Sequence, residues 1–313
     1  MRFSVALHNA YEGLGYPIGF VRDGGSFARL ARVAESLGFD GVWANDHLVT
    51  PSFLAQARRR PTFYEPLVTL ASVAASTERV ALGTAVIALP LRDPTLLASQ
   101  AATLQSLSGG RLRIGVGLGA YPEELAAIEP GRAPRDRGAR FDSAFASLRR
   151  LLSEGQTATR AFIPLYIGGH GTAAVERAAR EADGWIPGWQ PLTVVRERVA
   201  LLRDRAARLG RDPRSIAVAL ELSARIENEH EVATRRYEAS SLVTHRRARD
   251  RSGRDPGLMT ASNLVGSGEA IREKIAALAE AGVDECAALA FAVETQDELV
   301  EQWQRFAEAI LRA

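Results

Sequence analysis

The chain has little cysteine and no long apolar run, and each lack excludes a class of protein. A single cysteine, Cys286, among 313 residues excludes an internal disulfide and any cysteine-rich metal site. The longest apolar run, around residues 80–91, is too short to cross a bilayer. No charged segment followed by an apolar stretch stands at the start of the chain. The absence of these features predicts a soluble, cytoplasmic protein without a membrane partner.

An excess of charge of one sign is also missing. Lys+Arg 39 and Asp+Glu 37 leave a net charge of +2, so nucleic acid is not an expected partner. Histidine is scarce as well, because the chain has five and none of them forms a His-x-His pair. A metal-dependent hydrolase built on His8, Asp46 and His47 is therefore a rival hypothesis with little support.

Short apolar segments alternate with alanine- and leucine-rich helical patterns along the whole chain. Strands are expected to begin at Phe3, Gly41, Val80, Leu112, Leu165, Gly184, Ile216 and Cys286. Helices are expected over residues 25–37, 66–76, 95–107, 140–152, 172–182, 193–209, 269–281 and 296–311. This alternation predicts an α/β fold, a closed (β/α)8 TIM barrel that takes in residues 1–313 as one domain. Cys286 then lies in a buried strand, which favours an inert core thiol over a nucleophile.

Residues 225–256 depart from this alternation because they are dense in charge. One interpretation is a helical excursion on the barrel rim whose charges face water. The other is a lid over the substrate, since long loops at the carboxyl-terminal face of such barrels carry function. The sequence leaves both interpretations open.

Two glycine-rich segments follow expected strands, at the end of a barrel where binding sites are built. In SGGRLRIGVGLGAYPEE, residues 108–124, Gly117 and Gly119 would let the backbone approach a flat ligand closely. In Gly168-Gly169-His170-Gly171-Thr172, successive unhindered amides lead into a helix N-terminus, which suits a phosphate group. Tight turn packing is the alternative explanation for the second segment.

These segments occur in order with WANDH (residues 43–47), GTAVIALPLRDPTLLASQAATLQSLSGG (83–110) and PLYIGGHGTAAVERAAREADGWIP (164–187). Together they resemble the bacterial luciferase-like (LLM class) superfamily of flavin- or deazaflavin-dependent oxidoreductases, over nearly the whole chain. The resemblance implies a ring cofactor at the barrel mouth and hydride transfer to or from a small organic substrate. It favours coenzyme F420. The alternatives are an FMN-dependent monooxygenase supplied by a reductase partner, and a non-catalytic flavin-binding protein.

The resemblance also implies roles for individual residues. His47 is the expected catalytic residue, for proton transfer or for stabilising the reduced cofactor, and Asp46 is expected to orient or charge-tune its imidazole. A non-proline cis peptide between Ala85 and Val86 is implied, although a plain buried strand fits these small residues equally well. The expected cofactor-binding residues are His8, Thr84, Ala85, Val86, Gly117, Gly119, Gly168, Gly169, His170, Gly171 and Thr172.

Two positions depart from the sugar-phosphate dehydrogenases of the deazaflavin branch. Ala120 stands where those enzymes carry an acidic proton donor, and Pro51 stands where they carry an aromatic residue. Oxidation of a sugar 6-phosphate is therefore not expected, and the sequence names no other substrate. By the same resemblance we expect a homodimer, with a flavin or F420 reductase as a further partner.

Overall fold

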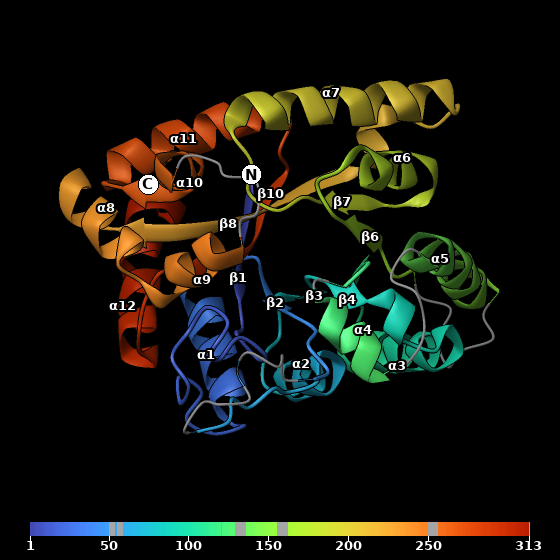
Figure 1. The fold of residues 1–313 in the computed structure, drawn as a ribbon, viewed down its shortest axis with the longest axis horizontal. Coiled ribbons are helices and arrows are strands. Elements are labelled where there is room, and N and C mark those ends of the chain that lie inside the picture. The colour runs from blue at the N-terminus through green and yellow to red at the C-terminus, as the bar shows by residue number, and fades with distance from the viewer. Residues whose placement is uncertain are drawn as a thin grey trace.

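The protein folds as a closed barrel of parallel strands inside a ring of helices (Figure 1). The computed structural model describes residues 1–49, 54, 59–119, 121–128, 136–154, 162–249 and 256–312. The barrel strands are β1 (Arg2–Ala6), β2 (Gly41–Ala44), β3 (Ala81–Thr84), β5 (Leu112–Gly117), β6 (Leu165–Gly168), β7 (Gly184–Ile186), β8 (Ala217–Ile226) and β10 (Glu285–Phe291). Each pairs in parallel with the next, and β10 pairs with both β1 and β8, which closes the barrel. The predicted (β/α)8 barrel is confirmed.

The helices of the outer ring lie where the sequence pattern placed them. They are α1 (Ser26–Leu37), α2 (Pro66–Ala74), α3 (Pro94–Leu107), α5 (Arg137–Ser153), α6 (Thr172–Glu181), α7 (Leu192–Arg208), α11 (Gly268–Glu280) and α12 (Gln296–Phe306). Helix α12 continues as a π-helical turn, η5 (Ala307–Leu311), and further short helical turns are η2 (Leu89–Leu91) and η4 (Pro213–Ser215). The structure adds two short strands, β4 (Ile87–Ala88) and β9 (Leu264–Gly266), and the helix α4 (Pro122–Ile128). Among the described residues, no helix has the length and apolarity that crossing a membrane requires.

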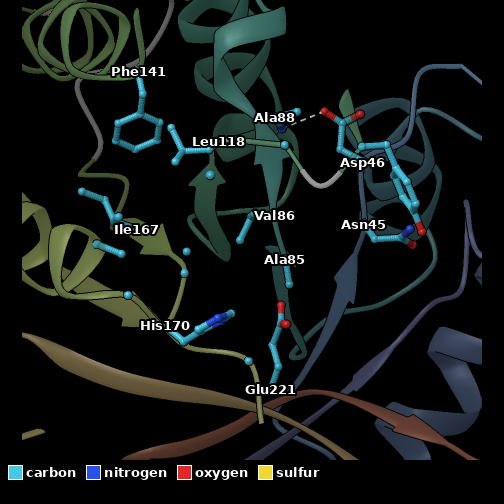
Figure 2. Close-up of a pocket in the computed structure, with 18 of the residues that line it drawn as sticks. Asn45, Asp46, Ala85, Val86, Ala88, Leu118, Phe141, Ile167, His170 and Glu221 are labelled. Atoms are coloured by element: carbon cyan, nitrogen blue, oxygen red, sulfur yellow. Dashed lines mark hydrogen bonds between the residues drawn. The ribbon is translucent and has the colours of Figure 1, made fainter. Parts of the chain in front are cut away.

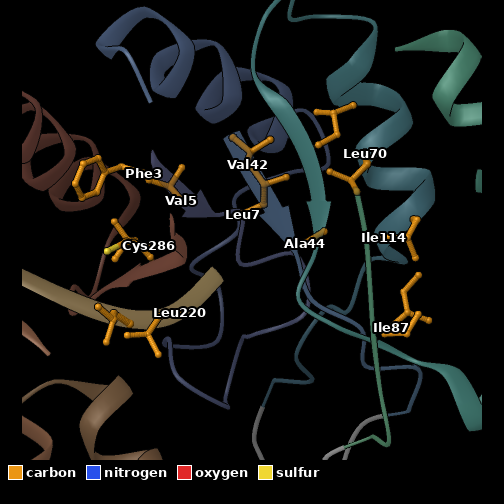
Figure 3. Close-up of a cluster of buried hydrophobic side chains, with 14 of the residues drawn as sticks. Phe3, Val5, Leu7, Val42, Ala44, Leu70, Ile87, Ile114, Leu220 and Cys286 are labelled. Carbon is orange, nitrogen blue, oxygen red and sulfur yellow. The ribbon is translucent and has the colours of Figure 1, made fainter. Parts of the chain in front are cut away.

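Alternation along each strand decides which side chains face the helices. On β1 and just after it, Phe3, Val5 and Leu7 pack with the helical layer (Figure 3). Ser4, between Phe3 and Val5, instead donates a hydrogen bond to the buried Glu285. Cys286 on β10 belongs to the same buried layer, and burial raises the pKa of its thiol to about 12. The predicted buried strand position of Cys286 is confirmed, and a thiol that stays protonated there is expected to be inert.

A buried carboxylate closes the amino-terminal end of the barrel. Glu285 is fully buried and accepts hydrogen bonds from Ser4 Oγ at 2.6 Å and Trp43 Nε1 at 3.2 Å. Two guanidinium groups neutralise its charge, Arg113 at 2.9 Å and Arg2 at 3.3 Å. Above this cluster, Trp43, Tyr166, Ile186, Ala219 and Ala287 form an apolar layer across the interior. The opposite, carboxyl-terminal end of the barrel is the end that remains open to a ligand.

The charged segment 225–256 begins later than its composition indicated. Arg225 is not part of an excursion but lies in β8, 2% exposed, where it pairs with Glu227 and Glu298. The chain leaves the barrel only after Ile226 and forms α8 (His230–Glu238) and α9 (Ser241–Arg249), then α10 (Pro256–Ser262). The predicted boundary was wrong because composition does not distinguish a buried arginine that is paired with carboxylates from one that faces water.

Gly115 on β5 marks a place where the barrel interior admits no side chain. A Cβ at this position would stand 2.1 Å from the carbonyl oxygen of Thr84 and 2.7 Å from Ile186 Cδ1. Because backbone atoms cannot move aside easily, Gly115→Ala is expected to destabilise the fold by about 3 kcal/mol. Urea denaturation measures this change in the free energy of unfolding.

Gly188 offers the matched control for this substitution. A Cβ there would meet no atom within 4 Å, so Gly188→Ala is expected to change stability by less than about 0.5 kcal/mol. Equal unfolding free energies for the two variants would show that the barrel relaxes around Gly115 and would contradict the prediction.

Candidate functional site

A cavity of about 710 Å³ opens at the carboxyl-terminal ends of the strands. Its wall comes from the segments that follow β2, β3, β5, β6 and β7, from β8, and from the helices α5, α6 and α9. Figure 2 shows Ala85 and Val86 at its centre, with Ile167 and His170 on one side and Asn45 and Asp46 on the other. The cavity thus lies where (β/α)8 barrels build their sites.

Most of the predicted site residues meet at this cavity. Those that line it are Asp46, His47, Ala85, Val86, Gly117, Gly119, Gly168, Gly169, His170 and Gly171. Three do not line it: His8, Thr84 and Thr172. Pro51 and Ala120, the two departures from the sugar-phosphate dehydrogenases, lie outside the described residues.

His8 is a core residue in this structure. Its ring packs on Tyr16 with centroids 4.1 Å apart, and neither ring nitrogen has a hydrogen-bond partner among the described residues. Burial lowers the pKa of His8 to about 3, so the imidazole is neutral. The resemblance implied a cofactor-binding role for His8, but its side chain is buried in the protein.

Thr84 and Thr172 are engaged with the protein itself. The Thr84 hydroxyl donates to the carbonyl of Gly115 at 2.8 Å and accepts from the Gly115 amide at 2.9 Å, which joins β3 to β5. The Thr172 hydroxyl accepts a hydrogen bond from Arg198 at 2.7 Å. Thr84 therefore links two barrel strands, whereas Thr172 lies exposed at the start of α6.

The Ala85–Val86 peptide is cis, as the resemblance implied. The Val86 side chain lies between two glycines of neighbouring strands, since a Cβ at Gly117 would be 2.6 Å and one at Gly168 would be 2.8 Å from its methyl groups. Glycine is thus required at both positions to make room for Val86. In this part of the wall the Val86 side chain lies against backbone on both sides, which leaves room for a flat ring to approach.

His47 is held from one side by a carboxylate that sequence analysis did not assign to it. The Nδ1 atom of His47 lies 3.3 Å from both oxygens of Glu124, which is 2% exposed. The amide of Leu48 donates to the same carboxylate at 3.0 Å. Because this carboxylate acts as an acceptor, Nδ1 carries the proton and Nε2 is the nitrogen that can serve a ligand in the cavity.

Asp46 does not orient His47, and that expectation is corrected. Its carboxylate accepts two hydrogen bonds from Arg92, at 2.5 and 3.3 Å, and one from the amide of Ala88 at 3.1 Å (Figure 2). Arg92 also pairs with Glu65 at 3.0 Å. Asp46 therefore fixes the segment after β3, whereas His47 pairs with Glu124.

The N-terminus of α6 forms the other end of the cavity. Gly171, its N-cap, makes no side-chain capping bond, and a Cβ there would meet no atom within 4 Å. The guanidinium of Arg177 on the same helix also lines the cavity and is held by Asp142 at 2.6 Å. Uncapped amides beside open space and a nearby cation fit the phosphate group of a flavin or deazaflavin.

Two charged residues of the wall were missed in the sequence. Glu221 on β8 points its carboxylate up toward Ala85, and burial raises its pKa to about 7 against the opposing charge of Arg246 (Figure 2). Arg246 reaches the same cavity from α9, beside His245. The signal for Glu221 was present as a lone acidic residue within the apolar strand ALELSARI, whereas nothing distinguishes Arg246 from the arginines around it.

The metal-site hypothesis has no geometric support. In the described part of the chain, no three side chains of His, Cys, Asp or Glu come together in a way that could hold a metal ion. His8 lies in the core, Asp46 pairs with Arg92, and His47 pairs with Glu124. The three residues of that hypothesis therefore lie in three different environments and do not form one site.

Comparison with known proteins agrees with this geometry. A family model described as luciferase-like monooxygenase matches residues 1–310. An F420-dependent glucose-6-phosphate dehydrogenase of Nakamurella multipartita is 31% identical over 249 residues, which cover 71% of this chain and 70% of that protein.

Two solved structures share the fold over nearly the whole chain. The monooxygenase RslO1 from Streptomyces bottropensis superposes with a TM-score of 0.79 at 23% identity, covering 100% of this chain and 99% of that one. An F420-dependent secondary alcohol dehydrogenase in complex with an F420–acetone adduct superposes with a TM-score of 0.78 at 16% identity, covering 99% and 98%.

Proposed function

Since the chain belongs to the luciferase-like monooxygenase family, we propose that it is an oxidoreductase that uses coenzyme F420 to transfer a hydride to or from a small organic substrate. The observation that carries this proposal is the form of the cavity. The cavity combines a wall in which Val86 lies between Gly117 and Gly168 with the imidazole of His47 and with the uncapped amides of α6. A tricyclic ring with a phosphate-bearing side chain has this same division into a flat part and an anionic part.

Each of the protein groups has a distinct part in the proposed reaction. When bound, the deazaflavin accepts or gives a hydride at its ring. Gly117, Gly168 and Val86 hold the flat face, and the amides at the start of α6 bind the phosphate. His47 presents Nε2 to the cavity and can give or take a proton there, because Glu124 holds Nδ1.

The choice of F420 over FMN rests on the curated relative with the F420-dependent activity, which is 31% identical over most of the chain. That relative oxidises glucose 6-phosphate, an activity that we do not propose here, because Ala120 and Pro51 replace the acidic and aromatic residues that the sugar-phosphate dehydrogenases carry. The alternative is an FMN-dependent monooxygenase with a reductase partner, favoured by the family description and by the likeness to the Streptomyces bottropensis monooxygenase. A cytoplasmic homodimer is part of the same proposal.

Parallel titration of the purified protein with F420 and with FMN tests this proposal. Cofactor fluorescence and visible absorbance report binding in both titrations. Tight binding of F420 with weak binding of FMN supports the proposed function. Tight binding of FMN alone would contradict it and would direct the search to oxygen-dependent assays with a flavin reductase.

Gly171→Asp probes the phosphate end of the site. An aspartate at this N-cap would place a carboxylate on the α6 amides, where it repels and displaces a phosphate, so F420 affinity is expected to fall at least about ten-fold. Stability is expected to stay equal or to rise by about 0.3 kcal/mol, because aspartate is a favourable N-cap and has room there. Fluorescence titration and thermal melting measure the two effects.

Gly171→Ala is the uncharged control. It adds only a methyl group in open space, and we expect it to retain most of the F420 affinity. A Gly171→Asp protein that binds F420 as the wild type does would place the phosphate elsewhere.

A further inference from the structure

Arg246 differs from Arg92, Arg177 and Arg225 in that it forms no ion pair with a carboxylate of the described residues. Arg92 pairs with Asp46, Arg177 with Asp142 and Arg225 with Glu227. Among the described residues, no carboxylate lies within 4 Å of the Arg246 guanidinium. A half-buried cation at a cavity wall that has no carboxylate in contact is costly, so this arrangement points to a ligand that supplies a negative charge.

A buried network of neutral groups holds Arg246 in place. Its Nη1 donates to Ser223 Oγ at 2.7 Å, and the Tyr237 hydroxyl lies 2.7 Å from the same oxygen. Ser223 in turn donates to Asn263 Oδ1 at 2.8 Å, and Ser223, Tyr237 and Asn263 are fully buried. The network takes only part of the five N–H donors of a guanidinium, while the residue lines the cavity.

The Arg246 charge persists in this setting. Burial acts to lower the pKa of Arg246, but the surrounding groups, Tyr237 first, together raise it above its ordinary value. Glu221 is the one carboxylate among these groups, and burial raises its own pKa to about 7, so that only part of it is ionised at neutral pH. Glu221 therefore does not act as a full counter-ion for Arg246.

The surroundings of Arg246 indicate the shape of the missing ligand. Tyr11, Tyr121 and Trp189 line the same cavity, and a hydrogen bond of 3.1 Å between Tyr121 and His245 joins α9 to the loop after β5. Aromatic side chains around a single cation suit a flat organic anion. The phosphate end of the cavity has its own cation, Arg177, on α6.

We propose that Arg246 binds the carboxylate of an aromatic or similarly flat organic acid, which is the substrate of this enzyme. The inference rests on the proposed function, because it assigns the substrate class of that same cavity. Helix α9 then serves as the substrate-binding wall of the site. Recognition by charge-assisted hydrogen bonds from a desolvated guanidinium discriminates strongly against uncharged analogues.

Calorimetric titration with benzoate and with benzamide, which has the same shape without the charge, tests the proposal. The full-length protein is first saturated with F420. We expect the wild type to bind benzoate at least about ten-fold more tightly than benzamide, and Arg246→Gln to bind both about equally. Arg247→Gln is the control, since this arginine is exposed on the same helix, and it should keep the wild-type preference.

The proposal is overturned if the wild type does not bind benzoate more tightly than benzamide. It is also overturned if Arg246→Gln still binds benzoate more tightly. If Arg246→Gln does not fold, Ser223→Ala removes the hydroxyl that orients the guanidinium and should reduce the preference at least about three-fold. An unchanged preference in that variant would also contradict the proposal.

A second arm separates the substrate from the cofactor as the source of the anion. The F420 affinity of Arg246→Gln should match that of the wild type, and benzoate should bind to the F420-saturated protein. Loss of F420 affinity together with exclusion of benzoate by F420 would assign Arg246 to an acidic part of the cofactor. If F420 does not bind at all, the proposed function fails, and the benzoate and benzamide titrations of the cofactor-free protein still test Arg246.

Discussion

Replacing His47 by alanine is expected to lower kcat by about 100- to 10,000-fold, the usual contribution of a positioned proton-transfer group. His47 is the imidazole of the cavity whose Nδ1 is fixed by a buried carboxylate, Glu124, and whose Nε2 is left for a ligand. The glycine wall and the α6 amides do not depend on this ring. F420 affinity is therefore expected to change by less than about ten-fold.

The measurement is steady-state kinetics with oxidised and with reduced F420. The substrate is the compound that the wild type turns over fastest in a panel of flat organic acids, ketones and enones. His230→Ala is the control, because His230 is exposed at the start of α8 and lies outside the cavity. Glu124→Gln should give an intermediate loss of kcat, since it keeps the shape but weakens the hold on Nδ1. Unchanged turnover in His47→Ala would assign this residue a structural role and would favour a flavin-binding protein without catalysis.

Glu285→Ala is expected to reduce the free energy of unfolding by about 3–5 kcal/mol, the largest effect on stability that we predict. The carboxylate is fully buried and is the common acceptor for Ser4, Trp43 and Arg113. Its removal leaves a guanidinium and two polar groups without their partner inside the barrel, and it also opens a cavity. Urea denaturation of the purified variant measures the loss.

Glu301→Ala provides the comparison at the surface. Glu301 forms an ion pair with Arg305 at 2.9 Å, but its side chain is 57% exposed, so its removal should cost less than about 1 kcal/mol. Glu285→Gln keeps the size and should fall between the two. Equal stability of the Glu285→Ala and Glu301→Ala proteins would contradict the prediction. It would mean that Arg113 and Arg2, at the amino-terminal end of the barrel, become hydrated without a loss of folding free energy.

Strand and helix positions were predictable because they depend on local patterns. Each barrel strand begins within two residues of its predicted start, since buried parallel strands are short apolar runs between helical repeats. Asp93 before Pro94 is a typical helix start, and its carboxylate accepts hydrogen bonds from the amides of Thr95 and Leu96. Periodicity and caps act over a few residues, so the sequence displays them directly.

Partner choice among charged side chains was not predictable. Asp46 stands beside His47 in the chain, yet it pairs with Arg92, while His47 pairs with Glu124 from a distant segment. Arg225 read as a surface charge and is buried in β8. Composition counts charges but does not give their distances, which arise only when the barrel closes.

The sequence by itself determined the barrel, the family, and the glycine segments that leave room for a flat ring, because these follow from spacing along the chain. Only the tertiary structure decided that Glu124 holds His47, that His8 is a core residue, and that Glu221 and Arg246 face the cavity. Closure of β10 onto β8 and the packing of α9 over the mouth bring these side chains together from segments far apart in sequence. Their burial then sets the charges that a ligand meets.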